Sequence, residues 1–180
     1  MVSKYWLRDG FWDECKKGCF DKIEKNGKTF NLNNYLHGYC DIFIIKLFEF
    51  GKKHNVTYPI CVIADNEGIT HAFSWIENEY VDIDYFIDVR GITSEKDEFF
   101  EEFEDFFDYK SWFDGIYEPE EGEIYFFYNI EDYLDFMLKK FPREEWYFEQ
   151  LDLLTESEEI LKTFENNYLL PQWIVDEIIE

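Results

Sequence analysis

Hydrophobic residues in the first half of the chain follow two different periods. Residues 40–50 (CDIFIIKLFEF) are apolar at helical spacing, and Gly38 before them and Gly51 after them can begin and end a helix. Three segments of strand character follow, at 57–64, 69–76 and 80–89. Short runs of turn residues separate these segments. The pattern predicts a helix that begins at Cys40 and packs on a small antiparallel meander.

The second half of the chain adds one strand and several helices. The predicted elements are a helix after Thr93, a strand at 123–130, a helix at 131–141 and further helical pieces in 143–180. No internal repeat or low-complexity linker divides the sequence. We therefore expect a single α+β domain over residues 1–180, with a core at about 34–95 and a C-terminal strand and helical extension at about 114–180.

Periodicity leaves the pairing of the second and third strands open. His71 lies on the apolar face of its strand, whereas Asp82, Asp84 and Asp88 lie opposite the apolar face of theirs. A two-residue turn would bring His71 to the side of the aspartates, and a three-residue turn would join the two apolar faces. Core burial favours the second register. In that register His71 would reach Asp88 only through a bulge or a bend near Gly91.

Three residues in this region have the side chains of a thiol hydrolase. Cys40 would stand at the positive end of a helix dipole, which lowers a thiol pKa and favours the reactive thiolate. His71 and Asp88 follow on neighbouring strands as a general base and a group that orients it. Each also has a structural interpretation. Free cysteines and strand histidines are often buried in cores, and Asp88 can cap a turn or pair with Arg90.

The segments HGYCDIFIIKL, ITHAFSW and FIDVRGI resemble the papain-like cysteine hydrolase superfamily, above all its small bacterial and phage members, over roughly residues 34–95. The resemblance implies that Cys40 is the nucleophile, His71 the base and Asp88 the orienting carboxylate of an acyl hydrolase or peptidase. The histidine-to-aspartate distance is longer than the family pattern, and Asp82 fits a short hairpin better. No cofactor or metal is expected, because the sequence has no glycine-rich phosphate loop and its cysteines and histidines lack ligand spacing.

Charge suggests a second function. The chain has 17 basic and 41 acidic residues, a formal net charge of -24, yet its hydrophobic content of 46% is that of a folded protein. Such a surface repels nucleic acid and anionic membranes and attracts a basic protein or peptide. Phage-encoded inhibitors of restriction or CRISPR systems resemble it in composition. The alternative to a hydrolase is therefore a non-catalytic nucleic-acid mimic that occupies a basic nucleic-acid-binding protein.

The N-terminal residues and the cysteines indicate a compartment. The sequence starts without the apolar segment of a signal peptide, and no apolar run reaches membrane-spanning length. The four cysteines are too few for a disulfide framework. We therefore expect a cytoplasmic protein.

Overall fold

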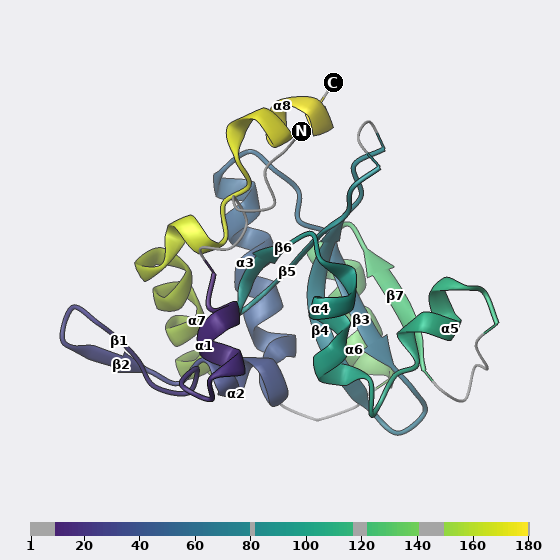
Figure 1. The fold of residues 1–180 in the computed structure, drawn as a ribbon, viewed down its shortest axis with the longest axis horizontal. Coiled ribbons are helices and arrows are strands. Elements are labelled where there is room, and N and C mark those ends of the chain that lie inside the picture. The colour runs from purple at the N-terminus through teal and green to yellow at the C-terminus, as the bar shows by residue number, and fades with distance from the viewer. Residues whose placement is uncertain (1–9, 80–81, 117–121, 141–149, 180) are drawn as a thin grey trace.

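A five-stranded antiparallel sheet forms the centre of the computed structural model, which describes residues 10–79, 82–116, 122–140 and 150–179 (Figure 1). The strands lie in the order β6-β5-β4-β3-β7. Their bounds are β3 (Ile60–Ala64), β4 (Ile69–Ile76), β5 (Tyr85–Asp88), β6 (Gly91–Thr93) and β7 (Glu123–Phe127). A mixed fold with a small antiparallel sheet and several helices confirms the predicted α+β class.

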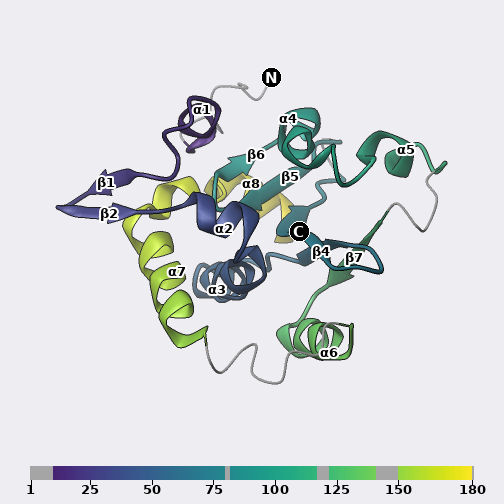
Figure 2. The ribbon, with the colours of Figure 1, turned by 90° about the horizontal axis from the view of Figure 1, so that it is seen from below.

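Helices cover both faces of this sheet (Figure 2). One face carries α3 (Cys40–Lys53) and α6 (Ile130–Lys140), and the other carries α4 (Lys96–Phe100), the 3-10 turn η1 (Glu101–Phe103) and α5 (Tyr109–Phe113). Helix α7 (Leu151–Thr163) packs along α3. The remaining elements are α1 (Trp12–Lys16), β1 (Ile23–Lys25), β2 (Lys28–Phe30), α2 (Asn33–His37), η4 (Glu165–Asn167) and α8 (Gln172–Ile179).

The central helix α3 begins at Cys40, as the sequence predicts, but it does not end at Gly51. It continues to Lys53. Gly51 is needed for packing instead, because a Cβ there would lie 2.9 Å from Cγ of Tyr58 and 2.9 Å from the carbonyl oxygen of Val56. The glycine therefore lets the returning chain lie against the last turn of the helix.

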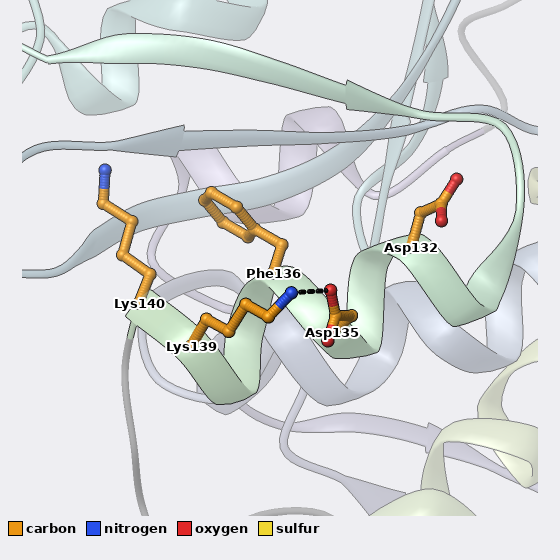
Figure 3. Close-up of a pocket in the computed structure, with 5 residues that line it drawn as sticks. All are labelled: Asp132, Asp135, Phe136, Lys139 and Lys140. Atoms are coloured by element: carbon orange, nitrogen blue, oxygen red, sulfur yellow. Dashed lines mark hydrogen bonds and ion pairs between the residues drawn. The ribbon is translucent and has the colours of Figure 1, made fainter.

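The C-terminal half of the chain belongs to the same sheet and core as the predicted catalytic region. Strand β7 pairs antiparallel with β3 along its whole length. Helix α6 then packs on β7, where the ring of Phe136 lies tilted against Tyr125 and Phe127. Lys139 pairs with Asp135 at the surface of the helix (Figure 3). The segment expected as an extension therefore forms one edge of the central sheet.

Strands β4 and β5 pair in a register that the sequence argument did not favour. The partners are Ser74 with Ile87, Trp75 with Phe86 and Ile76 with Tyr85. His71 therefore shares a face with Phe86 and Asp88. The expectation that the apolar faces would coincide was wrong because both faces of the sheet are buried. The connection is also longer than a tight turn, since β5 begins only at Tyr85; residues 80–81 lie outside the described part of the chain.

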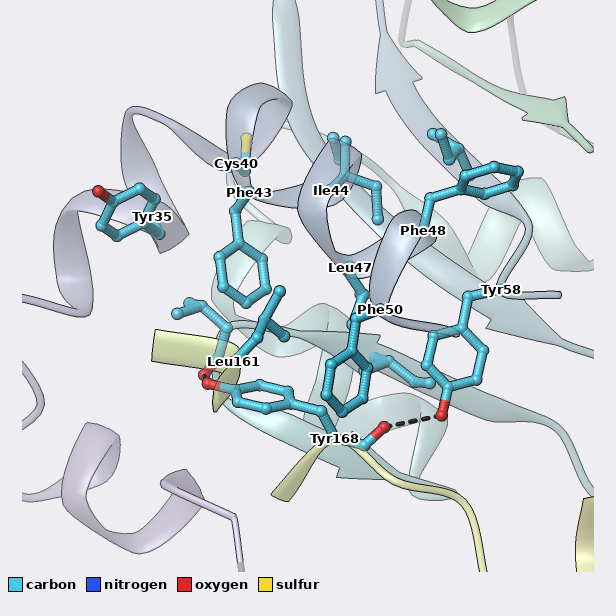
Figure 4. Close-up of a cluster of buried hydrophobic side chains, with 14 of the residues drawn as sticks. Tyr35, Cys40, Phe43, Ile44, Leu47, Phe48, Phe50, Tyr58, Leu161 and Tyr168 are labelled. Carbon is cyan, nitrogen blue, oxygen red and sulfur yellow. Dashed lines mark hydrogen bonds between the residues drawn. The ribbon is translucent and has the colours of Figure 1, made fainter. Parts of the chain in front are cut away.

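Two hydrophobic clusters fill the space on the two faces. The larger lies between the sheet, α3 and the C-terminal helices, where Phe43, Leu47 and Phe50 point toward Leu161 and Tyr168 (Figure 4). The hydroxyl of Tyr58 donates to the carbonyl of Tyr168 at 2.7 Å. The smaller cluster lies beneath α4 and α5 and is mostly aromatic, with Trp12, Phe73, Trp75, Phe86, Phe99 and Phe100 among its members.

Within the residues that the structure describes, no helix combines the length and the apolar character needed to cross a bilayer.

A glycine at the β5–β6 turn gives a test of the packing. Gly91 has φ +103°, and a Cβ there would lie 3.0 Å from the carbonyl oxygen of Asn167 and 3.1 Å from Cα of Gly10. Gly91→Ala should therefore lower the free energy of unfolding by about 1–3 kcal/mol. Denaturant unfolding measures this loss. Gly68→Ala is the control, because no atom lies within 4 Å of the added carbon. Equal stability losses in the two variants would contradict the described turn.

Candidate functional site

A buried carboxylate, Asp88, lies at the centre of the candidate site. Its oxygens accept hydrogen bonds from Nε2 of His71 at 2.9 Å, from the backbone N–H of Arg90 at 2.8 Å, and from Nε and Nη2 of Arg90 at 3.1 and 2.7 Å. His71, Asp88 and Arg90 are each at most 2% exposed. Burial alone would raise the pKa of Asp88, but the charge of Arg90 and the contact with His71 hold it well below its ordinary value.

The imidazole of His71 is held between aromatic rings and has one nitrogen without a partner. Its ring stacks on Phe103 with centroids 4.2 Å apart and on Phe73 at 5.9 Å. Burial lowers the pKa of His71 from 6.5, although the hydrogen bond to Asp88 opposes this. An ionised carboxylate only accepts, so Nε2 carries the proton of the neutral ring and Nδ1 keeps its lone pair. Nδ1 is buried without a hydrogen-bond partner in the described part of the chain.

Cys40 lies on the α3 side of the sheet. Figure 4 shows its sulfur at the start of α3, pointing away from the ring of Phe43. Burial first and the charge of Asp41 second raise the pKa of the thiol to about 12, while backbone hydrogen bonding from Ala72 and Asp41 opposes this shift. The expectation of a lowered thiol pKa was wrong, because burial outweighs the helix dipole.

The thiol and the imidazole approach the same segment of β4 from opposite faces. The sulfur of Cys40 lies beside the backbone of Ala72, the residue after His71. Ala72 lies beyond the end of the β4–β5 ladder, which begins at Ser74. Consecutive strand residues face opposite ways, so the ring of His71 lies on the α4 side. Among the described residues no hydrogen bond joins the sulfur to Nδ1 of His71.

The structure identifies which of the three aspartates contacts His71. Asp88 makes the contact. Asp82 is exposed at a left-handed backbone position with φ 53°. Asp84 is partly buried, and burial raises its pKa. The side chains of His71 and Asp88 meet diagonally across β4 and β5. The histidine can therefore reach an aspartate farther along the chain than the one that a short hairpin would place opposite it.

Residues outside the predicted triad cover the site. The guanidinium of Arg90 stacks on Trp12 at 4.1 Å. Phe103 lies over His71 and is 6.3 Å from the ring of His37, whose Nε2 lies 2.8 Å from Oε1 of Glu102 at the surface. Only one feature of the sequence indicates this cover: Arg90 follows Asp88 by two residues, close enough to pair with it. Trp12 and Phe103 come from distant segments and carried no local signal.

No protein-family model, curated protein or solved structure matched the chain. The likeness to papain-like hydrolases therefore remains a prediction from the sequence. All four cysteines, which lie within the described residues, are free. The described residues also contain no group of three or more histidine, cysteine or carboxylate side chains arranged to hold a metal ion.

The buried imidazole predicts a pH dependence of stability. The folded-state pKa of His71 is lowered, so below about pH 6.5 the unfolded chain takes up a proton that the folded chain does not. The neutral imidazole therefore contributes fully to the free energy of unfolding above that pH, and this contribution is lost as the pH falls. His71→Gln should reduce the slope of unfolding free energy against pH by up to about 1.4 kcal/mol per pH unit between roughly pH 6.5 and 5.

Chemical denaturation across that pH range measures the slope. His54→Gln is the control, because His54 is partly exposed and pairs with Glu165 at the surface. An unchanged slope in His71→Gln would show that the ring is not held in its neutral form.

Proposed function

We propose that the protein is a cysteine hydrolase of the papain-like type, with Cys40 as nucleophile, His71 as general base and Asp88 as the carboxylate that orients the base. The observation that supports this most strongly is the state of the imidazole. Nε2 is fixed by Asp88 at 2.9 Å, and Nδ1 is left with an unused lone pair. This is the tautomer that a base needs, and the helix that begins with the thiol lies beside the same strand.

The reaction follows from these roles. The two side chains lie on opposite faces of β4 in the described conformation, so they must first be brought together beyond the end of the β4–β5 ladder. Nδ1 of His71 then takes the proton of Cys40, and the sulfur attacks a substrate carbonyl carbon to form a tetrahedral oxyanion. The oxyanion collapses to a thioester as the leaving amine or alcohol takes the proton from His71. Water, deprotonated by His71, then hydrolyses the thioester and releases the thiol. Asp88 stabilises the imidazolium in both steps.

The first turn of α3 supplies the candidates for an oxyanion hole. The backbone N–H of Tyr39 is not one of them, because it already donates to the carbonyl of Asn34 at 2.8 Å. The backbone N–H of Cys40 lies at the positive end of the helix. A substrate oxygen held there would lie next to the sulfur.

The described conformation is a closed state of this proposed site. With a pKa of about 12, the thiol is protonated at neutral pH. Phe103 covers the imidazole, and the His37–Glu102 pair closes the surface above it. Turnover then requires η1 to move so that water and substrate reach Nδ1, and the first turn of α3 to move so that they reach the sulfur on the opposite face of β4 (Figure 2). Opening would also remove the burial that raises the pKa of the thiol.

Substitution of the nucleophile tests the proposal. Basic peptides with a coumarin amide after Arg or Lys, and p-nitrophenyl acetate, are suitable probes because the acidic surface favours cationic substrates. Cys40→Ala and Cys40→Ser should each reduce kcat by about 10³-fold or more. Cys61→Ala is the control, since this thiol is also fully buried but lies in the middle of β3.

A second readout covers the case in which these probes are poor substrates. Intact-mass analysis after treatment with an arginine vinyl sulfone should show one adduct, on Cys40, that His71→Gln slows. Alkylation confined to the exposed thiol of Cys19, together with no turnover, would contradict the hydrolase.

A second candidate, a non-catalytic acidic mimic, is favoured by the surface of the α4–α5 segment. Exposed carboxylates follow one another there, and Phe106 among them is 69% exposed. The exposed carboxylates of this segment are Asp97, Glu101, Glu102, Glu104, Asp105, Asp108 and Asp114. A basic groove that binds nucleic acid would meet fixed negative charge and an aromatic side chain on this surface.

Competition with DNA tests this candidate. The protein should displace duplex DNA from a fluorescent arginine-rich peptide, and displacement should weaken as salt rises. Glu101→Gln, Glu104→Gln and Asp105→Asn together should weaken displacement by about fivefold or more. The control carries the same charge change at scattered exposed sites, through Glu24→Gln, Glu67→Gln and Asp152→Asn. Equal effects of the two triples would mean that net charge alone acts, and a Cys40→Ala variant should behave as wild type.

A further inference from the structure

A cavity of about 410 Å³ lies at one end of the sheet, where β3 begins and β4 and β7 end. Its position follows from the strand register. Ile60 pairs with both Ser74 and Phe127, so the neighbouring residues Pro59, Trp75 and Tyr128 come together at the sheet end. All three line the cavity. It is separate from the candidate hydrolase site, since four residues of β4, or about 13 Å, separate His71 from Trp75.

Aromatic rings form one part of the cavity wall. Trp75 and Phe126 lie with ring centroids 5.3 Å apart at an interplanar angle of 47°. Phe126 is 38% exposed and Tyr128 is 67% exposed, so two large rings face solvent at a sheet end. Exposed aromatic surface around a cavity is a common feature of binding sites.

Two carboxylates accompany these rings. Glu77 and Glu79 follow β4, are exposed and line the same cavity. The described lining contains no lysine, arginine or histidine. Aromatic faces and carboxylates both attract cations, and an anion would meet only repulsion here. A purely apolar ligand would displace water from the two carboxylates without offering them a hydrogen bond, which is unfavourable.

The opposite face of β7 shows the same aromatic chemistry with its cation already in place. There Lys140 lies over the rings of Tyr125, at 4.6 Å, and Phe136, at 5.7 Å, beside the pocket shown in Figure 3. No lysine or arginine of the described chain lies over Trp75, Phe126 or Tyr128 in the same way. The cavity thus offers a cation site that no lysine or arginine among the described residues fills.

We propose that this cavity binds the cationic side chain of an arginine or lysine presented by a basic polypeptide. The aromatic rings would contact the stem and the charge, and Glu77 and Glu79 would pair with the guanidinium or ammonium group. The net charge of -24 would draw such a partner in. This site does not depend on Cys40 being a nucleophile, and its test needs no turnover.

Nuclear magnetic resonance titration with single side chains tests the proposal. N-acetyl-arginine amide and N-acetyl-lysine amide are the probes, and N-acetyl-norleucine amide is the uncharged comparison. The cationic probes should shift the amide resonances of Thr57, Trp75 and Asn78 and the indole N–H of Trp75, whereas norleucine should not. The affinities measured in the lysine and arginine titrations show which of the two cations the site prefers.

Two pairs of variants separate this site from general surface charge. Glu77→Gln with Glu79→Gln should weaken binding about fivefold or more, and Tyr128→Ala about two- to fivefold. The matched controls are Glu24→Gln with Glu67→Gln, and Leu151→Ala, which alter exposed residues that line neither this cavity nor the acidic surface after α4. Norleucine binding as tightly as lysine, or equal losses in the control variants, would overturn the proposal.

Discussion

The carboxylate of Asp88 is the constraint on which the centre of the structure depends. A charged carboxylate that is only 1% exposed is tolerated only when it is paired and hydrogen-bonded, and here Arg90 and His71 supply four donor groups. Those partners fix their own surroundings. Arg90 must keep Trp12 of α1 over its guanidinium, and His71 must keep Phe103 of η1 over its ring. One carboxylate thus links β4, β5, α1 and η1.

The sequence predicted the elements whose pattern is local. The start of α3 at Cys40, the strand at β7 and the helix at α6 follow from periodicity and from breakers within a few residues of each end. Predictions failed where distant contacts decide the outcome. Gly51 lies inside α3 because Tyr58 needs the space, and the helix expected after Thr93 breaks at η1, where the Phe103 side chain packs over His71.

The candidate site shows the same limit. Cys40, His71 and Asp88 could be chosen from residue type and order, and the pairing of His71 with Asp88 is present. The register argument failed because it assumed one solvent-facing side for β5, whereas Phe86 is buried as deeply as Ile87. The pKa of Cys40 could not be inferred either. A helix start alone suggests a lowered value, and only the packing around the sulfur shows that desolvation dominates.

Nδ1 of His71, which has no hydrogen-bond partner among the described residues, is difficult to explain by its contribution to the stability of the fold. A buried polar group without a hydrogen bond costs about 1–3 kcal/mol, and a phenylalanine at this place would join the ring stack of Phe73 and Phe103 without that cost. A purely structural pair for Asp88 already exists in Arg90, which offers both a backbone and a side-chain donor. The imidazole is therefore superfluous for neutralising the carboxylate. Asp88 orients the imidazole so that its lone pair points away from their contact, which is the orientation that the proposed general base requires.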